Sequence, residues 1–181
     1  MAIEIEKKYR LSSEQSKQIA ANLQEFGADF QGEDFETNTL YRGGILDEKQ
    51  AVLRIRKTGD KTILTYKQRI QNASVIKHQI EHETIVESAK EIEKIIENLG
   101  FVKAVVYEKR RKTWGFRNVE VVLDELPFGL FMEIEGSIQE ITEAEMLLDA
   151  VDFEVEPETY PRLTMKQGIQ NGQIIEAKFV D

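Results

Sequence analysis

Residues 1–11 read MAIEIEKKYRL, and Glu4, Glu6 and Lys8 come at every second position of this stretch. Successive side chains of a β-strand point to opposite faces, so these three charges would share one face of a strand. The opposite face would carry two isoleucines and a lysine. A single strand of this kind usually presents its charges to water. The alternative is a face that gathers two acids and a base around a ligand.

Pairs of like charge at even spacing recur along the chain. They lie in LRIR, TYKQR, IEHE, YEKRRKTW, VEVVLDE and FMEIEG, and they are Arg54 with Arg56, Lys67 with Arg69, Glu81 with Glu83, Lys109 with Arg111, Glu120 with Asp124, and Glu133 with Glu135. A strand face in water normally mixes Ser, Thr and Gln with scattered charges. Separate pairs of acids and bases therefore indicate an arranged surface and count against a merely solvated one.

Hydrophobic periodicity and turn residues predict an α+β fold in one domain, 1–181, built on a large antiparallel sheet. Strands are expected at residues 3–11, 35–42, 51–57, 62–69, 76–86, 104–114, 118–125 and 130–136. Helices are expected at 12–26, at 88–100 with a capping box of Ser88 and Glu91, from about Thr142 with Glu145 three residues on, and at 161–167. The stretches KTGDKT and GFRN predict hairpin turns.

Composition excludes several classes of protein. At 181 residues, with 41% hydrophobic and 31% charged residues, the chain suits a soluble globular domain. No cysteine is present, so disulfides and thiolate chemistry are excluded, and a metal would bind through oxygen or histidine. No apolar run could cross a bilayer and no signal peptide is evident, so no membrane association and a cytoplasmic location are expected. The net charge of −9 argues against nucleic acid as a partner.

The mixture of acids and bases predicts the chemistry of the ligand. If the sheet closes into a barrel, the charged faces meet in the lumen, where unmatched charges are costly unless water or a ligand satisfies them. Carboxylate pairs suit Mg²⁺ or Mn²⁺, and arrays of Arg and Lys suit phosphate oxygens. The chain has no glycine-rich phosphate loop, so side chains would have to bind the phosphates. A metal-bound polyphosphate is the ligand that fits.

The ordered set of motifs resembles the CYTH superfamily, also called triphosphate tunnel metalloenzymes. The set begins with the E-x-E-x-K strand and continues with LRIR, LTYK, IEHE, YEKRRKTW, VVLDELPFG and MEIEG, and it covers nearly the whole chain. The resemblance implies a closed eight-stranded antiparallel β-barrel that forms a tunnel, with helices packed outside. It also implies a small-molecule triphosphate as substrate.

The resemblance assigns expected roles to individual residues. The triphosphate would be bound by Lys8, Arg54, Arg56, Lys67, Lys109 and Arg111. Mg²⁺ or Mn²⁺ would be held by Glu4, Glu6, Asp124, Glu133 and Glu135. Lys8, Glu81 and Glu83 are the candidate catalytic residues, the two acids to hold a second metal or position water.

Three functions stay open at this point. The first choice is hydrolysis of inorganic or organic triphosphate, such as tripolyphosphate, thiamine triphosphate or a nucleotide, because it requires only the visible features. The alternative is a class IV adenylyl cyclase, which converts ATP to cyclic AMP and pyrophosphate and needs an adenine pocket as well. The third is a noncatalytic polyphosphate- or nucleotide-binding module. The oligomeric state is open, with a homodimer possible.

Some residues have ordinary structural explanations. Arg69, Lys77, Arg110 and Lys112 are expected to be solvated, and Glu120 is left out of the site because strand ends often carry exposed acids. His78 and His82 would lie well apart on one strand face, which favours structural or surface roles. Trp114 and Tyr66 are expected to pack in the core or at a rim.

Overall fold

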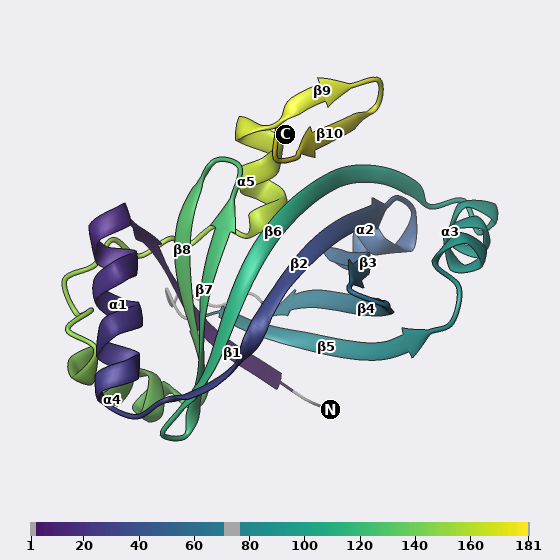
Figure 1. The fold of residues 1–181 in the computed structure, drawn as a ribbon. Coiled ribbons are helices and arrows are strands. Elements are labelled where there is room, and N and C mark those ends of the chain that lie inside the picture. Colours follow the sequence, from purple (N-terminus) through teal and green to yellow (C-terminus); the bar gives the residue numbers. More distant parts are fainter. Residues whose placement is uncertain (1–2, 71–76, 181) are drawn as a thin grey trace.

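The computed structural model describes residues 3–70 and 77–180, and it contains one large curved sheet with helices around it (Figure 1). The strands are β1 Ile3–Leu11, β2 Asp29–Arg42, β3 Ala51–Thr58, β4 Lys61–Ile70, β5 Lys77–Val86, β6 Val102–Phe116, β7 Val119–Leu126, β8 Gly129–Glu135, β9 Ile169–Asn171 and β10 Ile174–Ala177. The helices are α1 Ser13–Glu25, α2 Ile45–Glu48, α3 Ala89–Asn98, α4 Ile138–Leu147 and α5 Tyr160–Gln167.

Strand pairing brings distant parts of the chain together. In the part of the chain that the structure describes, the sheet has ten strands in the order β2-β3-β4-β5-β1-β8-β7-β6-β10-β9, and β6 also pairs with β2. Each of the strands β1 to β8 is therefore hydrogen-bonded to at least two others. The pairs among them are antiparallel, whereas β10 runs parallel to β6. The predicted α+β class and the mostly antiparallel sheet are confirmed.

The sequence missed two short strands and the exposed start of a third. Of the ten strands found in the described residues, the prediction omitted β9 and β10. It also began the second strand at Phe35, whereas β2 begins at Asp29. Most of the residues at 29–35 are exposed, and all three residues of β9 are exposed. A strand without a buried face shows no alternation of apolar and polar residues, so its sequence carries no periodic signal.

Helix ends follow the capping residues, with one error in the prediction. Ser12 and Gln15 form a capping box at the start of α1. At the start of α3 the Ser88 hydroxyl accepts from the Glu91 N–H, which is one of the two hydrogen bonds of the capping box predicted there. The prediction that α4 begins near Thr142 was wrong, because a capping box of Ser137 with Glu140 starts this helix earlier. Within the described residues, every helix is too short or too polar to cross a membrane.

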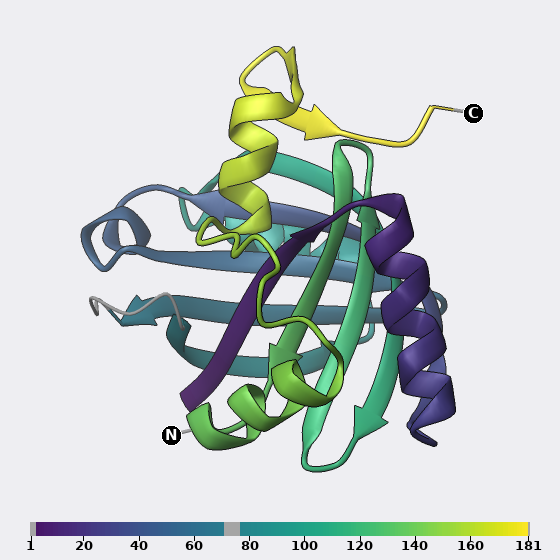
Figure 2. The ribbon, with the colours of Figure 1, turned by 90° about the vertical axis from the view of Figure 1, so that its left-hand side faces the viewer.

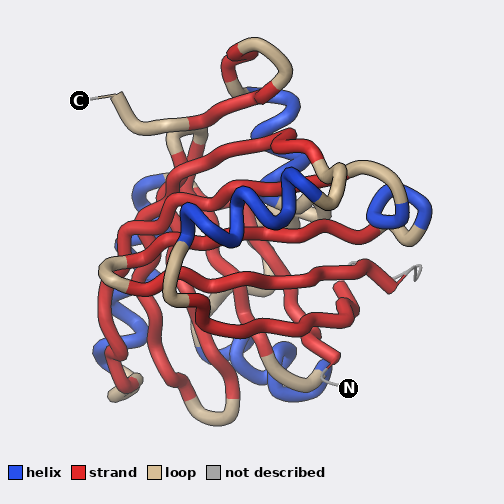
Figure 3. Tube along the Cα trace, turned by 90° about the vertical axis from the view of Figure 1, so that its right-hand side faces the viewer, coloured by secondary structure: helices blue, strands red, loops and turns tan. Residues whose placement is uncertain are grey.

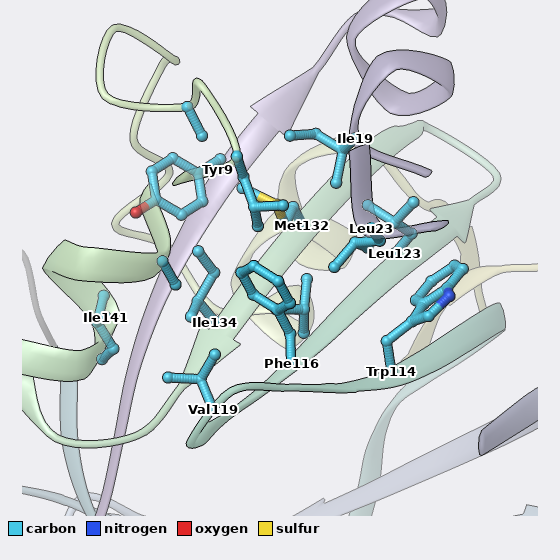
Figure 4. Packing of buried hydrophobic residues seen from close by; sticks show 14 of the residues in the cluster. Tyr9, Ile19, Leu23, Trp114, Phe116, Val119, Leu123, Met132, Ile134 and Ile141 are labelled. Atoms are coloured by element: carbon cyan, nitrogen blue, oxygen red, sulfur yellow. The ribbon is translucent and has the colours of Figure 1, made fainter. Parts of the chain in front are cut away.

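The main core lies on the outer face of the sheet, beneath α1 and α4. Ile19 and Leu23 of α1 are fully buried against strand residues such as Met132, Phe116 and Trp114 (Figure 4). Figure 2 shows α1 and α4 lying against this side of the strands. The ring of Trp114 packs 5.1 Å from that of Phe30, centroid to centroid, as its predicted packing role requires. The outer face of these strands is thus covered by α1 and α4 and forms part of the hydrophobic core.

Two further helices cover other parts of the sheet. On the side of the molecule shown in Figure 3, α3 packs through Ile96 on Tyr41 and Ile55. At one end of the strands, α5 packs through Tyr160 and Leu163 in a cluster with apolar residues of β2, β6 and β8. Since side chains alternate along each strand, the faces opposite the cores under α1, α4 and α3 are left for polar residues. The α5 cluster instead lies at one end of that inner face, where Leu40, Val105 and Tyr107 also line the cavity.

Candidate functional site

The charged inner faces of the strands surround one cavity of about 1040 Å³. The predicted site residues that line it are Glu6, Lys8, Arg54, Arg56, Lys67, Glu81, Glu83, Lys109, Arg111, Glu133 and Glu135. The side chain of Glu4 lies outside the described part of the chain. Asp124 is 1% exposed and is covered by Arg111 and Tyr160, to which it is hydrogen-bonded. The even spacing seen in the sequence thus places nearly all of these side chains around one space.

Asp124 holds Arg111 in place. The Arg111 guanidinium donates from Nε to Asp124 Oδ1 at 2.7 Å and from Nη2 to Oδ2 at 2.6 Å. The same Nη2 donates to Glu133 Oε2 at 2.6 Å. Such a two-pronged contact fixes the plane of a guanidinium as well as its position. Asp124 therefore contacts a base of the cavity wall, and its expected role as a metal ligand stays a prediction.

Glu36 is a buried acid that the sequence did not single out. It is 3% exposed, and its Oε2 lies 3.3 Å from Lys109 Nζ and 3.5 Å from Arg56 Nε. Burial alone would raise the pKa of Glu36, but Lys109, Arg56 and Arg111 outweigh burial and hold the pKa far below its ordinary value. Asp34 lies two residues before Glu36 in DFETNTL, but the predicted strand began at Phe35, so the two acids were not recognised as a pair on one strand face.

Tyr160 of α5 is a second residue that the sequence missed. Its hydroxyl donates to Asp124 Oδ2 at 2.7 Å, and its ring centroid lies 3.6 Å from Lys8 Nζ and 5.3 Å from Lys109 Nζ. Lys8 Nζ also lies 3.2 Å from Glu133 Oε1. Helix α5 therefore contacts the bases of the cavity wall through one aromatic side chain. Only the packing of α5 onto the sheet brings Tyr160 there, so spacing along a strand gave no signal.

On the β4 and β5 side, acids and bases also alternate. Lys67 Nζ lies 2.9 Å from Glu81 Oε2, and Arg54 Nη2 lies 3.4 Å from Glu81 Oε1 and 3.6 Å from Glu83 Oε2. Thr65 is fully buried; its hydroxyl accepts from Arg54 and donates to Glu83. The predicted pair of Glu81 and Glu83 thus lies beside two of the predicted phosphate-binding bases.

Three carboxylates form a row across β1, β8 and β7. Glu135 is the cross-strand partner of both Glu6 and Glu120, and all three line the cavity. Burial raises the pKa of Glu135, and the charges of Glu120 and Glu6 raise it further. Glu120, which the sequence analysis left out of the site, therefore belongs to the cavity wall. A cation beside this row would relieve the mutual repulsion of its charges.

The fit to a metal can be judged from these carboxylates. Oxygen donors of this kind are those that Mg²⁺ and Mn²⁺ prefer. Within the described residues, however, no three acidic or histidine side chains already form a metal-binding group. The donor chemistry fits a divalent ion, and the side chains would have to rearrange around it.

The residues expected to be ordinary are placed as follows. Arg110 and Lys112 are exposed and pair with exposed acids, Glu125 at 3.3 Å and Glu33 at 3.8 Å. The ring of His82 stacks on that of Tyr66 with centroids 6.2 Å apart. The side chains of Arg69, Lys77 and His78 lie outside the described part of the chain.

Comparisons with known proteins identify the family and the fold. The model of the family described as CYTH domain matches residues 2–161. A candidate adenylate cyclase of Methanocaldococcus jannaschii, MJ0240, is 27% identical over 151 residues, covering 81% of this chain and 84% of that protein. The solved structure of the PH1012 protein from Pyrococcus horikoshii has a TM-score of 0.77 at 25% identity, covering 88% of this chain and 98% of that chain.

A plant structure shares the fold at lower identity. HpAC1 from Hippeastrum, described as having a dominant triphosphatase activity, has a TM-score of 0.69 at 16% identity. It covers 92% of this chain and 97% of that chain. A likeness at this level of identity shows the fold alone.

Proposed function

Because the chain belongs to the CYTH domain family, we propose that it is a divalent-metal-dependent enzyme that hydrolyses a triphosphate bound in the cavity. The observation that carries the proposal is that six bases from four strands line one cavity, namely Lys8, Arg54, Arg56, Lys67, Lys109 and Arg111. A triphosphate is a compact chain of negative charge that such an array would bind along its length.

Arginine N–H groups in the cavity wall also favour the binding of an anion. Within the described structure, the buried Nε atom of Arg54 has no hydrogen-bond partner, and that of Arg56 has only the ion-pair contact with Glu36 Oε2 at 3.5 Å. Buried donors are nearly always satisfied, and leaving one without an acceptor costs free energy. Phosphate oxygens in the cavity would supply those acceptors.

We further propose that the strands β1 to β8 act as a closed tunnel. The pairing of β6 with β2 supports this, because β2 and β6 are the first and the last of these eight strands in the order of the sheet. A closed wall would surround the triphosphate with charged side chains and limit the access of bulk water.

Positioning and neutralisation of charge account for most of the catalysis of phosphoryl transfer. Arg111, fixed by Asp124, and Lys109 would bind phosphate oxygens without having to reorganise. Glu83, which lines the cavity and has a 41% exposed side chain, would accept the proton of the attacking water. Mg²⁺ or Mn²⁺, held by Glu4, Glu6, Glu133 and Glu135, would supply Lewis acidity and neutralise the developing charge. Orthophosphate and a shortened chain would leave.

The second candidate is an adenylyl cyclase, favoured by the name of the M. jannaschii relative at 27% identity. In that reaction the ribose 3′-hydroxyl of ATP attacks the α-phosphorus, and pyrophosphate leaves. The same bases would hold the triphosphate, so the wall residues do not distinguish the two reactions. The products do.

A product assay tests the proposal. The purified protein is incubated with Mg²⁺ or Mn²⁺ and with ATP, tripolyphosphate or thiamine triphosphate, and cyclic AMP, pyrophosphate and orthophosphate are resolved. We expect orthophosphate, with the fastest release from the physiological class of substrate. Cyclic AMP with matching pyrophosphate would replace hydrolysis by cyclisation. Tight binding of a triphosphate without turnover at any metal concentration would show that the protein is a noncatalytic binding module.

A further inference from the structure

Two buried carboxylates lie beside bases of the cavity wall, on the same inner faces of their strands. Glu36 approaches both Lys109 and Arg56, at 3.3 and 3.5 Å, and Asp124 approaches Lys109 at 3.5 Å. The acids are 3% and 1% exposed, whereas the two bases line the cavity. Each base therefore meets a fixed anion on one side and the ligand space on the other.

We propose that Glu36 is a positioning residue, which holds Arg56 and Lys109 so that their remaining N–H groups point into the cavity. It would act through these bases without touching the substrate. The inference rests on the proposed function, since it assumes that the bases bind a triphosphate. Asp124 does the same for Arg111, to which it makes two hydrogen bonds.

The physical reason lies in the flexibility of the two bases. Arg and Lys side chains lose much rotational entropy when they are ordered. A buried counter-ion imposes that order before the substrate arrives, so the donors need not reorganise as charge develops in the transition state. The Asn38 amide, which donates to Glu36 Oε2 at 3.2 Å, holds the carboxylate itself in place.

This role predicts an unusual signature. The fixed negative charge of Glu36 beside Lys109 and Arg56 reduces the attraction between these bases and a triphosphate in the ground state. Neutralising Glu36 should therefore leave triphosphate binding as tight as before, or tighter, while turnover falls because the bases lose their orientation. A residue that only supported the fold would lose binding and turnover together.

The test is Glu36→Gln, which keeps the size of the side chain and removes its charge. Binding of tripolyphosphate is measured by calorimetry in metal-free buffer. Turnover is measured with Mg²⁺ on whichever of tripolyphosphate, thiamine triphosphate and ATP the unmodified protein turns over fastest. We expect kcat to fall at least about tenfold, with a dissociation constant no weaker than that of the unmodified protein.

The matched control is Glu33→Gln on the same strand. Glu33 has a 53% exposed side chain and pairs only loosely with Lys112, at 3.8 Å, so both measurements should stay within about twofold. Unchanged kcat in a folded Glu36→Gln protein would overturn the inference, and so would parallel losses of binding and kcat.

A second variant decides the question if Glu36→Gln does not fold. Glu36→Asp keeps the charge but withdraws it from Lys109 and Arg56, so kcat should fall to a smaller extent with binding retained. Unchanged kcat in this variant would overturn the inference. If the unmodified protein neither binds nor turns over any of the three triphosphates, the proposed function fails and the inference fails with it.

Discussion

Glu36 of β2 and Glu135 of β8 are carboxylates on strands that β6 and β7 separate, and their pKa values move in opposite directions. Burial disfavours the charged form of both, but bases surround Glu36 and lower its pKa, whereas Glu120 and Glu6 add to the rise at Glu135. The difference teaches that neighbours decide what an acid does. Glu36 serves as a counter-ion for bases, whereas Glu135 belongs to a row of carboxylates whose repulsion a bound cation would reduce.

The largest effect is expected when a base that is ion-paired with a buried carboxylate is removed. Arg111→Ala would remove a phosphate-binding group and leave buried Asp124 without its two-pronged partner. Loss of one partner of a buried ion pair costs about 3–5 kcal/mol of unfolding free energy. We expect kcat/KM to fall by about 10³-fold or more. Steady-state kinetics and denaturant unfolding measure the two effects.

Arg110→Ala is the matched control for Arg111→Ala. Arg110 is the next residue, points to the other face, and pairs with exposed Glu125 at 3.3 Å. Because surface ion pairs contribute about 0–1 kcal/mol, activity and stability should hardly change. Equal losses in both variants would refute the assignment of inner and outer faces.

The acidic row is tested by Glu120→Gln. Removing one of its three charges should raise the Mg²⁺ concentration needed for half-maximal activity by about tenfold, a change typical of groups around a metal site. The measurement is a metal titration of turnover at saturating triphosphate. Glu125→Gln, on the same strand and paired with Arg110, should leave the titration where it was. An unchanged titration in Glu120→Gln would exclude Glu120 from metal binding.

A smaller effect is expected when the hydrogen bond from Tyr160 of α5 to Asp124 is removed. Tyr160→Phe would delete the hydroxyl that donates to Asp124 but keep the ring beside Lys8. Hydrogen bonds to charged groups contribute about 1.5–3 kcal/mol, so unfolding should become easier by that amount. Activity should fall only a few-fold, because Arg111 still binds Asp124. Full stability in Tyr160→Phe would show that this hydrogen bond contributes nothing.

The smallest effect concerns pH and the stability of the metal-free protein. A carboxyl whose pKa is raised in the folded state adds stability below its unfolded pKa, near 4.5, and loses that contribution as pH rises through the folded pKa. Glu135→Gln should therefore melt slightly higher than the unmodified protein at pH 7, with the difference shrinking toward pH 4. The gain is small because Glu135 is partly exposed. A lower melting temperature at pH 7 would contradict the repulsion in the row.

The paired motifs could be predicted as parts of one site, whereas the supporting residues could not. Arg54 with Arg56 and Glu133 with Glu135 share faces because any strand has a period of two. The acid at even spacing from Glu36 is Asp34, which lies before the predicted start of the strand at Phe35, and Tyr160 lies on a helix. Their importance comes from neighbours that are far away in sequence, which a local pattern does not contain.

The sequence by itself determined which charged side chains point the same way, since alternation is a local property of an extended backbone. The tertiary structure decided which faces meet. Pairing of β2 with β6 sets Glu36 opposite Lys109, and pairing of β7 with β8 sets Glu120 opposite Glu135. The reason is physical: the charge state and role of a buried carboxylate depend on the groups within a few ångströms, and folding alone brings those groups together.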